Sequence, residues 1–253
     1  MPGVPAARQV LAVLQALGGQ PGPVPAAVLA RDLGLPRSTT YHLLHELIAA
    51  GFVVHLPEER RFGLGVAAFE LGTAYMRQEP LARLARPVLA RFVDAVGESA
   101  HLAVLHGREV LYVVEERAAG RPSLVTDVGV RLPAQLTASG RAMLAELPAA
   151  HVRALFPDAA AFVERHDAGP RSLSALRRLL TDARRAGYAT EDGQVTQGLA
   201  SVAAAVHDHT GHPVAGVAVT FASDAYDAPA RERLASAVRH VAAELSRRIG
   251  GVA

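Results

Sequence analysis

The sequence of 253 residues has room for one large domain or two ordinary ones, and half of its residues are hydrophobic, enough for a sizeable core. It has no cysteine, which excludes disulfides, thiolate metal sites and cysteine nucleophiles and is typical of a cytoplasmic protein. All 26 cationic side chains are arginine, and the formal net charge of +2 neither requires nor excludes a polyanionic partner. No uninterrupted run of about 18 apolar residues is present, so we expect no membrane span, and Met1 to Arg8 do not have the pattern of a signal peptide.

The first part of the chain is predicted to form helices. Apolar residues at helical spacing indicate helices over 6–17 and 26–33, separated by the turn GGQPGPVP. A third helix, 36–50, follows a Gly-Leu-Pro break and has Pro36 in its first turn, where a missing N–H costs nothing. Five of its residues recur at helical spacing and are expected to face a core: Thr40, Leu43, Leu44, Leu47 and Ile48.

A short hairpin is predicted directly after this helix. The stretch FVVHLPEERRFGLG, 52–65, alternates like two strands around a turn at 57–60. Three helices followed by a small hairpin is the element order of a winged helix-turn-helix, a fold that binds DNA.

The outer side of the third helix carries groups that suit a nucleic acid. Short hydroxyls and free N–H groups at a helix N-terminus suit phosphate oxygens, and arginine, histidine and tyrosine can reach base edges in the major groove. Arginines at the hairpin tip would lie along the flanking backbone or the minor groove. The candidate DNA-binding residues are Arg37, Ser38, Thr39, Tyr41, His42, His45, Arg60 and Arg61. The alternative is an ordinary solvated face.

The charge of this region is low for a DNA-binding module. Five arginines stand against four acidic residues through Gly65, a net charge of +1. Because phosphate neutralisation supplies much of the affinity for DNA, a single copy should bind weakly. A dimer that reads two half-sites would supply what one module lacks.

The rest of the chain is predicted to hold a connecting helix, 66–77, and a second domain. Within that domain, strands alternate with helices in an order typical of an α/β (α+β) sensor-like domain with a mostly antiparallel sheet, rather than of a doubly wound nucleotide fold. The expected helices are 81–96, 138–147, 149–156, 172–186 and 228–249, and the expected strands lie within 99–117, 123–133, 188–192, 201–207 and 213–222.

Several stretches, in order along the chain, resemble the IclR family of transcriptional regulators. LARDLGLPRSTTYHLLHELIAAGFV resembles the family's helix-turn-helix, and RRFGLGVAAFELG resembles its wing and the start of its linker helix. Successive parts of its C-terminal domain are similar to SAHLAVLHGREVLYVVE, VGVRLPAQLTASGRAMLA, RRAGYATEDGQVTQGLASVAAAVHD and PVAGVAVTF. The resemblance spans nearly the whole chain, with gaps only at the extreme N-terminus and at about 150–170.

The resemblance implies a winged helix-turn-helix over 1–65, a linker helix over 66–80 and a GAF-like effector-binding and oligomerisation domain over 81–253. It also implies homodimers, often paired into tetramers, that bind double-stranded promoter DNA. The family often has arginine where this sequence has His42, and an aliphatic residue where it has Thr40. His42 is shorter than arginine and titrates near neutral pH, so we expect it to distinguish this operator from those of relatives.

The resemblance further implies a small-molecule site in the C-terminal domain. Carried over position by position, its residues are Ala138, Ser139, Glu191, Ser201, Ala218 and Thr220, with Leu124 and Leu132 as candidates for the apolar lining. The start of the helix at Ala138 and Ser139 would offer backbone N–H groups to a carboxylate. A carboxylate with an apolar or aromatic body is favoured over a very small polar acid.

No catalytic residue, metal ligand or cofactor is expected. The sequence lacks a G-x-S-x-G nucleophile elbow, an H-E-x-x-H pair and the lysine of a phosphate-binding loop. The stretch HDHTGHP, 207–213, has metal-binding residue types, but residues of a hairpin turn diverge, so a solvated turn is expected. Two alternatives remain open: the C-terminal domain is a dimerisation module without a ligand, or it is a small-molecule hydrolase.

Overall fold

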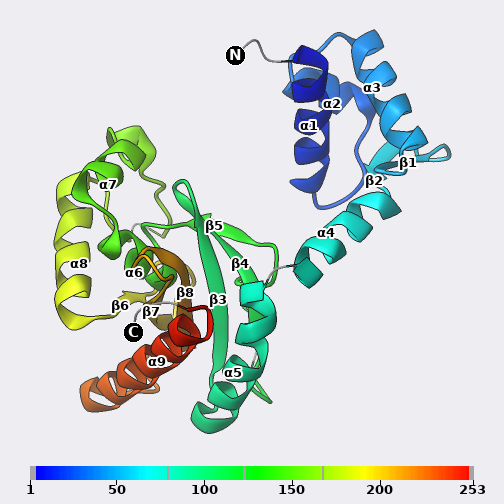
Figure 1. Ribbon diagram of the computed structural model, residues 1–253. Helices are drawn as coiled ribbons and strands as arrows, with labels where there is room; N and C mark the ends of the chain where they lie inside the picture. The colour runs from blue at the N-terminus through cyan, green and yellow to red at the C-terminus, as the bar shows by residue number, and fades with distance from the viewer. Residues whose placement is uncertain (1–3, 79, 122–123, 167, 251–253) are drawn as a thin grey trace. The chain divides into compact units, whose positions relative to one another are not determined.

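The computed structural model describes residues 4–78, 80–121, 124–166 and 168–250, with only the backbone of 73–78 and 80. The chain divides into two compact units, Met1–Glu79 and Pro80–Ala253 (Figure 1). Each unit buries hydrophobic clusters of its own, which is the property that defines a domain.

The N-terminal unit places a hairpin between its third and fourth helices. Its elements are α1 (Pro5–Gly18), α2 (Ala26–Asp32), α3 (Arg37–Ala49), β1 (Val53–Leu56), β2 (Arg61–Leu64) and α4 (Val66–Gln78). The turn from α2 into α3 contains Gly34 at a φ of 63°, in the left-handed region that glycine adopts without strain. This order confirms the predicted winged helix-turn-helix.

The core of the N-terminal unit lies between α1, α2, α3 and the hairpin. Leu44 and Leu47 are buried there as predicted, but Ile48 is 37% exposed, so its prediction as a core residue is wrong. Ile48 follows Leu47 by one residue, and a rotation of about 100° per residue carries it past the edge of the apolar stripe. Thr40 is fully buried, and its hydroxyl donates to the carbonyl oxygen of Pro36 at 3.1 Å.

The hairpin is held to the connection between α1 and α2. Strands β1 and β2 pair in antiparallel register, and Val24 adds a bridge to Phe62 on the other side of β2. The N–H of Val24 lies 2.9 Å from the Phe62 carbonyl oxygen, and the N–H of Phe62 lies 2.8 Å from the Val24 carbonyl oxygen. The wing therefore has a fixed base.

The C-terminal unit is built on an antiparallel sheet with strand order β5-β4-β3-β8-β7-β6. Its strands are β3 (Ser99–His106), β4 (Glu109–Glu116), β5 (Arg131–Pro133), β6 (Ala189–Asp192), β7 (Leu199–His207) and β8 (Pro213–Ala222). Its helices are α5 (Pro80–Val96), α6 (Ala138–Glu146), α7 (Ala149–Leu155), α8 (Leu173–Ala186) and α9 (Ala228–Arg248), with a short 3-10 turn η1 (Ala159–Ala161).

Helices cover both faces of this sheet (Figure 1). On one face, α5 and α9 form a core with Leu102, Val217 and Val219. On the other face, α6, α7 and α8 pack over Ala103, Tyr112 and Ala218. The predicted antiparallel sheet with flanking helices is therefore confirmed.

The segment between β4 and β5 departs from prediction. Strand character was expected over 123–133, but only Arg131–Pro133 forms a strand, and residues 122–123 lie outside the described part of the chain. A turn interrupts the alternation, because the Asp127 carboxylate accepts the Val128 N–H at 2.7 Å and Gly129 has a φ of 88°. In the described residues, no helix is long and apolar enough to cross a bilayer.

Candidate functional site

The outer side of α3 presents most of the predicted DNA-binding residues to solvent. Those exposed are Arg37, Ser38, Tyr41, His42 and His45, whereas Thr39 is half-buried. No side chain caps the N-terminus of α3, where Pro36 is the cap residue. The first N–H groups of the helix therefore remain available to an anion.

The two arginines of the wing differ in whether their side chains are hydrogen-bonded to the rest of the domain. Arg60 is exposed at the hairpin turn with a φ of 52°, whereas Arg61 donates to the Pro23 carbonyl oxygen at 3.2 Å. Phe62 braces the wing against α3: its ring stacks on His55 at 4.6 Å and meets the edge of Tyr41 at 6.2 Å. Helix and wing therefore present their side chains as one surface.

The C-terminal unit has a cavity between the start of α6 and the sheet. Its walls include seven predicted residues: Leu124, Ala138, Ser139, Glu191, Ser201, Ala218 and Thr220. Leu132 is not among the lining residues: it is paired with Val110 in the sheet and packs in the same hydrophobic cluster as Ala138. Sequence reasoning missed His101, Tyr112, Val125, Thr126, Thr137, Val195, Thr196 and Leu199.

The start of α6 is fixed against the cavity by two local features. Thr137 is the N-cap residue, and its hydroxyl oxygen accepts the Gly140 N–H at 3.0 Å. A Cβ atom at Gly140 would lie only 2.3 Å from the carbonyl oxygen of Ala134. Glycine therefore allows the helix to begin against the preceding turn, with the backbone of Ala138 and Ser139 at the cavity wall.

Two buried polar atoms of this cavity, Ser139 Oγ and His101 Nδ1, make no hydrogen bond of ordinary geometry, although the Tyr112 phenol lies near Ser139. His101 Nε2 lies 2.7 Å from the Thr126 hydroxyl, and its ring meets the edge of Tyr112 at 5.8 Å. Burial lowers the pKa of His101 to about 4, with a further contribution from the charge of Arg117, so the ring is neutral at pH 7. A neutral imidazole can donate or accept, so these two atoms could both bind a polar ligand.

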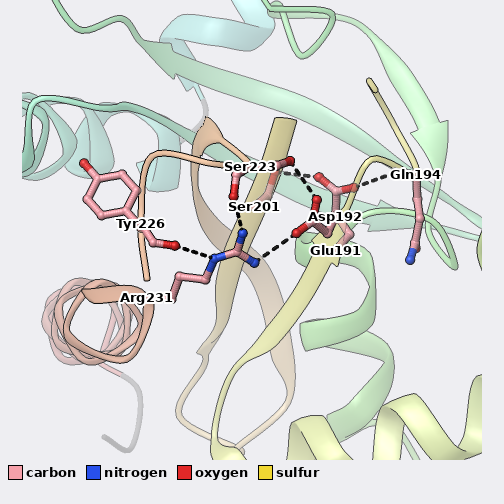
Figure 2. Close-up of polar contacts among 7 residues, drawn as sticks. All are labelled: Glu191, Asp192, Gln194, Ser201, Ser223, Tyr226 and Arg231. Atoms are coloured by element: carbon pink, nitrogen blue, oxygen red, sulfur yellow. Dashed lines mark hydrogen bonds and ion pairs between the residues drawn. The ribbon is translucent and has the colours of Figure 1, made fainter. Parts of the chain in front are cut away.

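Glu191 supplies the opposite wall of the cavity with a buried carboxylate (Figure 2). Its Oε1 accepts from Ser201 Oγ at 2.8 Å, and its Oε2 accepts the backbone N–H groups of Gln194 and Val195 at 3.2 and 3.4 Å. Burial raises the pKa of Glu191, whereas these hydrogen bonds act in the opposite direction. Burial, and then the charge of Glu191, raise the pKa of Tyr112, so its phenol remains protonated, whereas the Ser139 hydroxyl acts in the opposite direction.

Arg141 connects the two walls. Its side chain is buried and donates to the carbonyl oxygens of Gln135 at 2.8 Å and Thr190 at 2.7 Å, and to the Gln194 side chain. Burial lowers the pKa of Arg141 to about 10, so its charge persists at pH 7. The arginine therefore fixes the loop that follows β6 to the start of α6.

Asp192 lies next to Glu191 but serves another part of the unit. Figure 2 shows that its carboxylate accepts from Ser223 Oγ at 2.7 Å and from Arg231 at 2.9 Å, whereas Glu191 bonds Ser201. Arg231 belongs to α9. Strand β6 therefore presents one acid to the cavity and the next acid to α9.

The histidine-rich turn between β7 and β8 uses its acid to hold itself together. Asp208 accepts the N–H groups of Thr210 at 2.8 Å and His212 at 3.0 Å, as well as the Thr210 hydroxyl. Hydrogen bonds from Thr210, above all, lower the pKa of Asp208 to about 2. Among the described residues, no group of three or more potential ligands is placed to hold a metal ion.

Two family models match the chain. The IclR helix-turn-helix domain matches residues 6–57, and the bacterial transcriptional regulator IclR C-terminal domain matches residues 73–247. The glycerol operon regulatory protein of Streptomyces coelicolor is 32% identical over 245 residues, 96% of this chain and 95% of that protein. The transcriptional repressor IclR of Escherichia coli is 27% identical over 212 residues, 83% of this chain and 77% of that protein.

Solved structures share the fold at lower identity. An IclR transcriptional regulator from Alicyclobacillus acidocaldarius superposes with a TM-score of 0.83 at 23% identity, covering 98% of this chain and 100% of that chain. An IclR homologue from Microbacterium hydrocarbonoxydans, complexed with 4-hydroxybenzoate, has a TM-score of 0.80 at 23% identity, covering 96% and 98%. At these identities the likeness extends to the fold.

A winged helix-turn-helix followed by a separate α+β unit defines a two-domain regulator of transcription. The family models and the relatives agree along most of the chain. The chain belongs to the IclR family of bacterial transcriptional regulators: it is a DNA-binding regulator and not an enzyme.

Proposed function

We propose that this regulator is controlled by a small carboxylate bound in the cavity at the start of α6. The proposal rests on one observation: Ser139 Oγ and His101 Nδ1 line the same cavity, and both are buried without a hydrogen bond of ordinary geometry. An unmade hydrogen bond at a buried polar atom costs about 1–3 kcal/mol. A ligand carboxylate could accept from both atoms and from the free N–H groups of α6.

We propose that the other predicted residues of the cavity complete this site. Leu124 and Val125 supply apolar surface beside the polar groups, which suits an acid with an apolar or aromatic body. The relative complexed with 4-hydroxybenzoate is an example of such an acid bound to a protein of this fold. In a dimerisation module that binds no ligand, two such polar atoms would cost stability without serving a function. We therefore consider that alternative less well supported.

We propose that the DNA-binding surface consists of α3 and the wing, with residues 1–65 as the DNA-binding domain and 66–80 as a linker helix to the effector domain. The chain would act in the cytoplasm, where promoter DNA is found, as a homodimer or homotetramer on double-stranded operators. The net charge of +1 through Gly65 supports this need for paired modules.

Control of DNA binding requires that the ligand bind two arrangements of the protein with different affinity. A ligand that bound both equally would shift nothing. We propose that the carboxylate favours one placement of the two DNA-binding domains in the oligomer, through the linker helices. Repression and activation are both compatible with this scheme.

The test is operator binding by the full-length protein, measured by footprinting and fluorescence anisotropy on DNA beside its own gene. Arg37→Ala and His42→Ala should each weaken specific binding by about 1–3 kcal/mol, as for loss of a base contact. Arg8→Ala is the matched control, since Arg8 is exposed on α1. Unchanged affinity in both α3 variants would refute the surface, and an acid that binds yet leaves operator affinity and transcription unchanged would refute the control.

A further inference from the structure

Three side chains form a hydrogen-bonded row along one wall of the cavity. Glu191 on β6 is paired with Ser201 on β7, and Ser201 is paired with Thr220 on β8. Ser201 Oγ lies 2.8 Å from Glu191 Oε1 and 3.0 Å from Thr220 Oγ1. Because the register of three neighbouring strands sets these positions, the row is a rigid part of the cavity wall.

The direction of the hydrogen bonds in this row follows from the number of protons. Burial raises the pKa of Glu191, but the two backbone N–H groups accepted at Oε2, Ser201 at Oε1 and the charge of Arg141 all favour the charged form. A carboxylate only accepts, and a serine hydroxyl has one proton. Ser201 therefore donates its proton to Glu191 and must accept the proton of Thr220.

Thr220 is consequently left with lone pairs alone for a ligand. It lines the cavity, where it can accept a hydrogen bond but has no proton to give. A carboxylate placed here would set an acceptor against an acceptor, near the negative charge of Glu191, which Arg141 offsets only in part. A hydroxyl or N–H group of a ligand would satisfy Thr220.

The anion-binding groups lie at a different place along β8. Ser139 packs over Gly216, since a Cβ atom at Gly216 would lie 3.1 Å from Ser139 Cβ. Thr220 follows Gly216 by four residues, roughly 13 Å along an extended strand. His101 is paired with Ala218, between the two. Thr220 is therefore separated along β8 from both groups that would hold the carboxylate, and is farther from Ser139 than from His101.

We propose that the ligand is a hydroxy acid, with its carboxylate at Ser139 and His101 and its hydroxyl donating to Thr220. This inference rests on the proposed function, which places the carboxylate at the start of α6. An acid with a methyl group in place of the hydroxyl leaves Thr220 unpartnered. An acid with a second carboxylate places an acceptor against an acceptor, beside the charge of Glu191, and is rejected.

Matched acids test the proposal on the full-length protein by isothermal titration calorimetry. One set is 4-hydroxybenzoate, 4-methylbenzoate and terephthalate, and a shorter set is glycolate, propionate and malonate. Within the set that fits the cavity, the hydroxy acid should bind about tenfold more tightly than the methyl acid, the worth of one neutral hydrogen bond. The dicarboxylate should bind most weakly.

Two variants distinguish the effect of the hydrogen-bonded row on ligand preference from a general loss of cavity structure. Thr220→Val keeps the shape but removes the acceptor, so the preference for hydroxyl over methyl should fall from about tenfold to near one. Ser201→Ala releases the Thr220 proton, so the discrimination against the dicarboxylate should weaken. Thr190→Val is the matched control, because Thr190 is an exposed residue of β6 whose side chain is outside the row; it should keep both preferences.

The outcomes distinguish this inference from the function on which it rests. Equal binding of the hydroxy and methyl acids to the wild-type protein, or an unchanged preference in Thr220→Val, would overturn the hydroxy-acid assignment and leave carboxylate control standing. If none of the six acids binds or changes operator affinity, carboxylate control fails and the assignment fails with it. A thermal melt of each variant shows whether it folds, and Ser201→Ala remains decisive if Thr220→Val does not.

Discussion

At the scale of single residues, the cavity at the start of α6 is distinguished by two buried polar atoms that lack a hydrogen bond of ordinary geometry. Within the described part of the chain, the buried side-chain nitrogen and oxygen atoms without a partner are His101 Nδ1 and Ser139 Oγ, and both line this cavity. Buried polar groups are nearly always paired in folded proteins. The exceptions here are consistent with a site whose last hydrogen bonds are made by a ligand.

His101 should make stability depend on pH. The unfolded chain takes up a proton at the ordinary pKa of 6.5, whereas the folded protein does not until about pH 4. The free energy of unfolding should therefore be full above pH 6.5 and fall by on the order of 3 kcal/mol as the pH drops towards 4. Urea unfolding of His101→Gln should lack this part of the slope, and His106→Gln, an exposed histidine of the same strand, should retain it. Equal slopes in both variants would contradict the assignment.

Ser139 and Ser201 should respond oppositely to loss of their hydroxyls. Ser139→Ala removes an unpartnered buried group, so the unliganded protein should be unchanged or more stable by up to about 1 kcal/mol, while acid binding weakens. Ser201→Ala breaks two hydrogen bonds and should destabilise by about 1–2 kcal/mol. Both are measured by urea unfolding without ligand. A stability loss in Ser139→Ala as large as in Ser201→Ala would indicate a structural role for both.

At the scale of elements, the start of α6 depends on the absence of a side chain. A Cβ at Gly140 would meet backbone atoms of Ala134 at 2.3 and 2.5 Å, and backbone cannot rotate away. Gly140→Ala should therefore cost about 2–4 kcal/mol in the free energy of unfolding. Gly72→Ala is the matched control, since Gly72 lies in α4 with open space around its Cβ position. It should stabilise by about 0.5–1 kcal/mol, and similar losses in both would contradict the close approach.

Most elements could be predicted because their periodicity is strong, whereas the cavity's strand residues could not. The helix expected over 228–249 is formed as α9, where Leu234, Val238 and Leu245 recur at helical spacing and are buried. A bulge between Leu102 and Ala103 shifts the register of β3 against β4, and no sequence pattern signals it. His101 and Tyr112 were therefore not predicted as cavity residues. The polar residues Ser99 and His101, two apart on β3, could have indicated that this face of the strand contains polar groups.

Of the site residues suggested by the family resemblance, some line the cavity and one does not, depending on where the backbone places them. Residues at the start of α6 and on β6, β7 and β8 lie on the cavity because the sheet register carries them there. Leu132 lies in a three-residue edge strand whose neighbouring loop has no periodicity to predict. Local pattern fixes which residues alternate, but packing decides which face becomes a cavity.

At the scale of the whole molecule, the weak charge of the DNA-binding domain supports the proposal that the protein binds its operator as an oligomer. A net charge of +1 through Gly65 gives one domain little phosphate affinity. Two linked domains on two half-sites gain from effective concentration, commonly by a factor of about 10²–10⁴. We therefore expect an operator cut to one half-site to lose at least about 100-fold in affinity. Anisotropy at fixed salt measures this, and equal affinity for half and full operators would show that single domains suffice.

The two acids of β6 have a consequence for how this protein can vary. Glu191 bonds Ser201 beneath the cavity, and Asp192 bonds Arg231 of α9. Since successive strand residues point to opposite faces, a one-residue insertion or deletion within β6 would exchange the two acids between the cavity and the helix. Length changes within β6 should therefore be tolerated poorly. Ligand preference in this protein is consequently free to change by substitution around the cavity, but the frame of β6 is not.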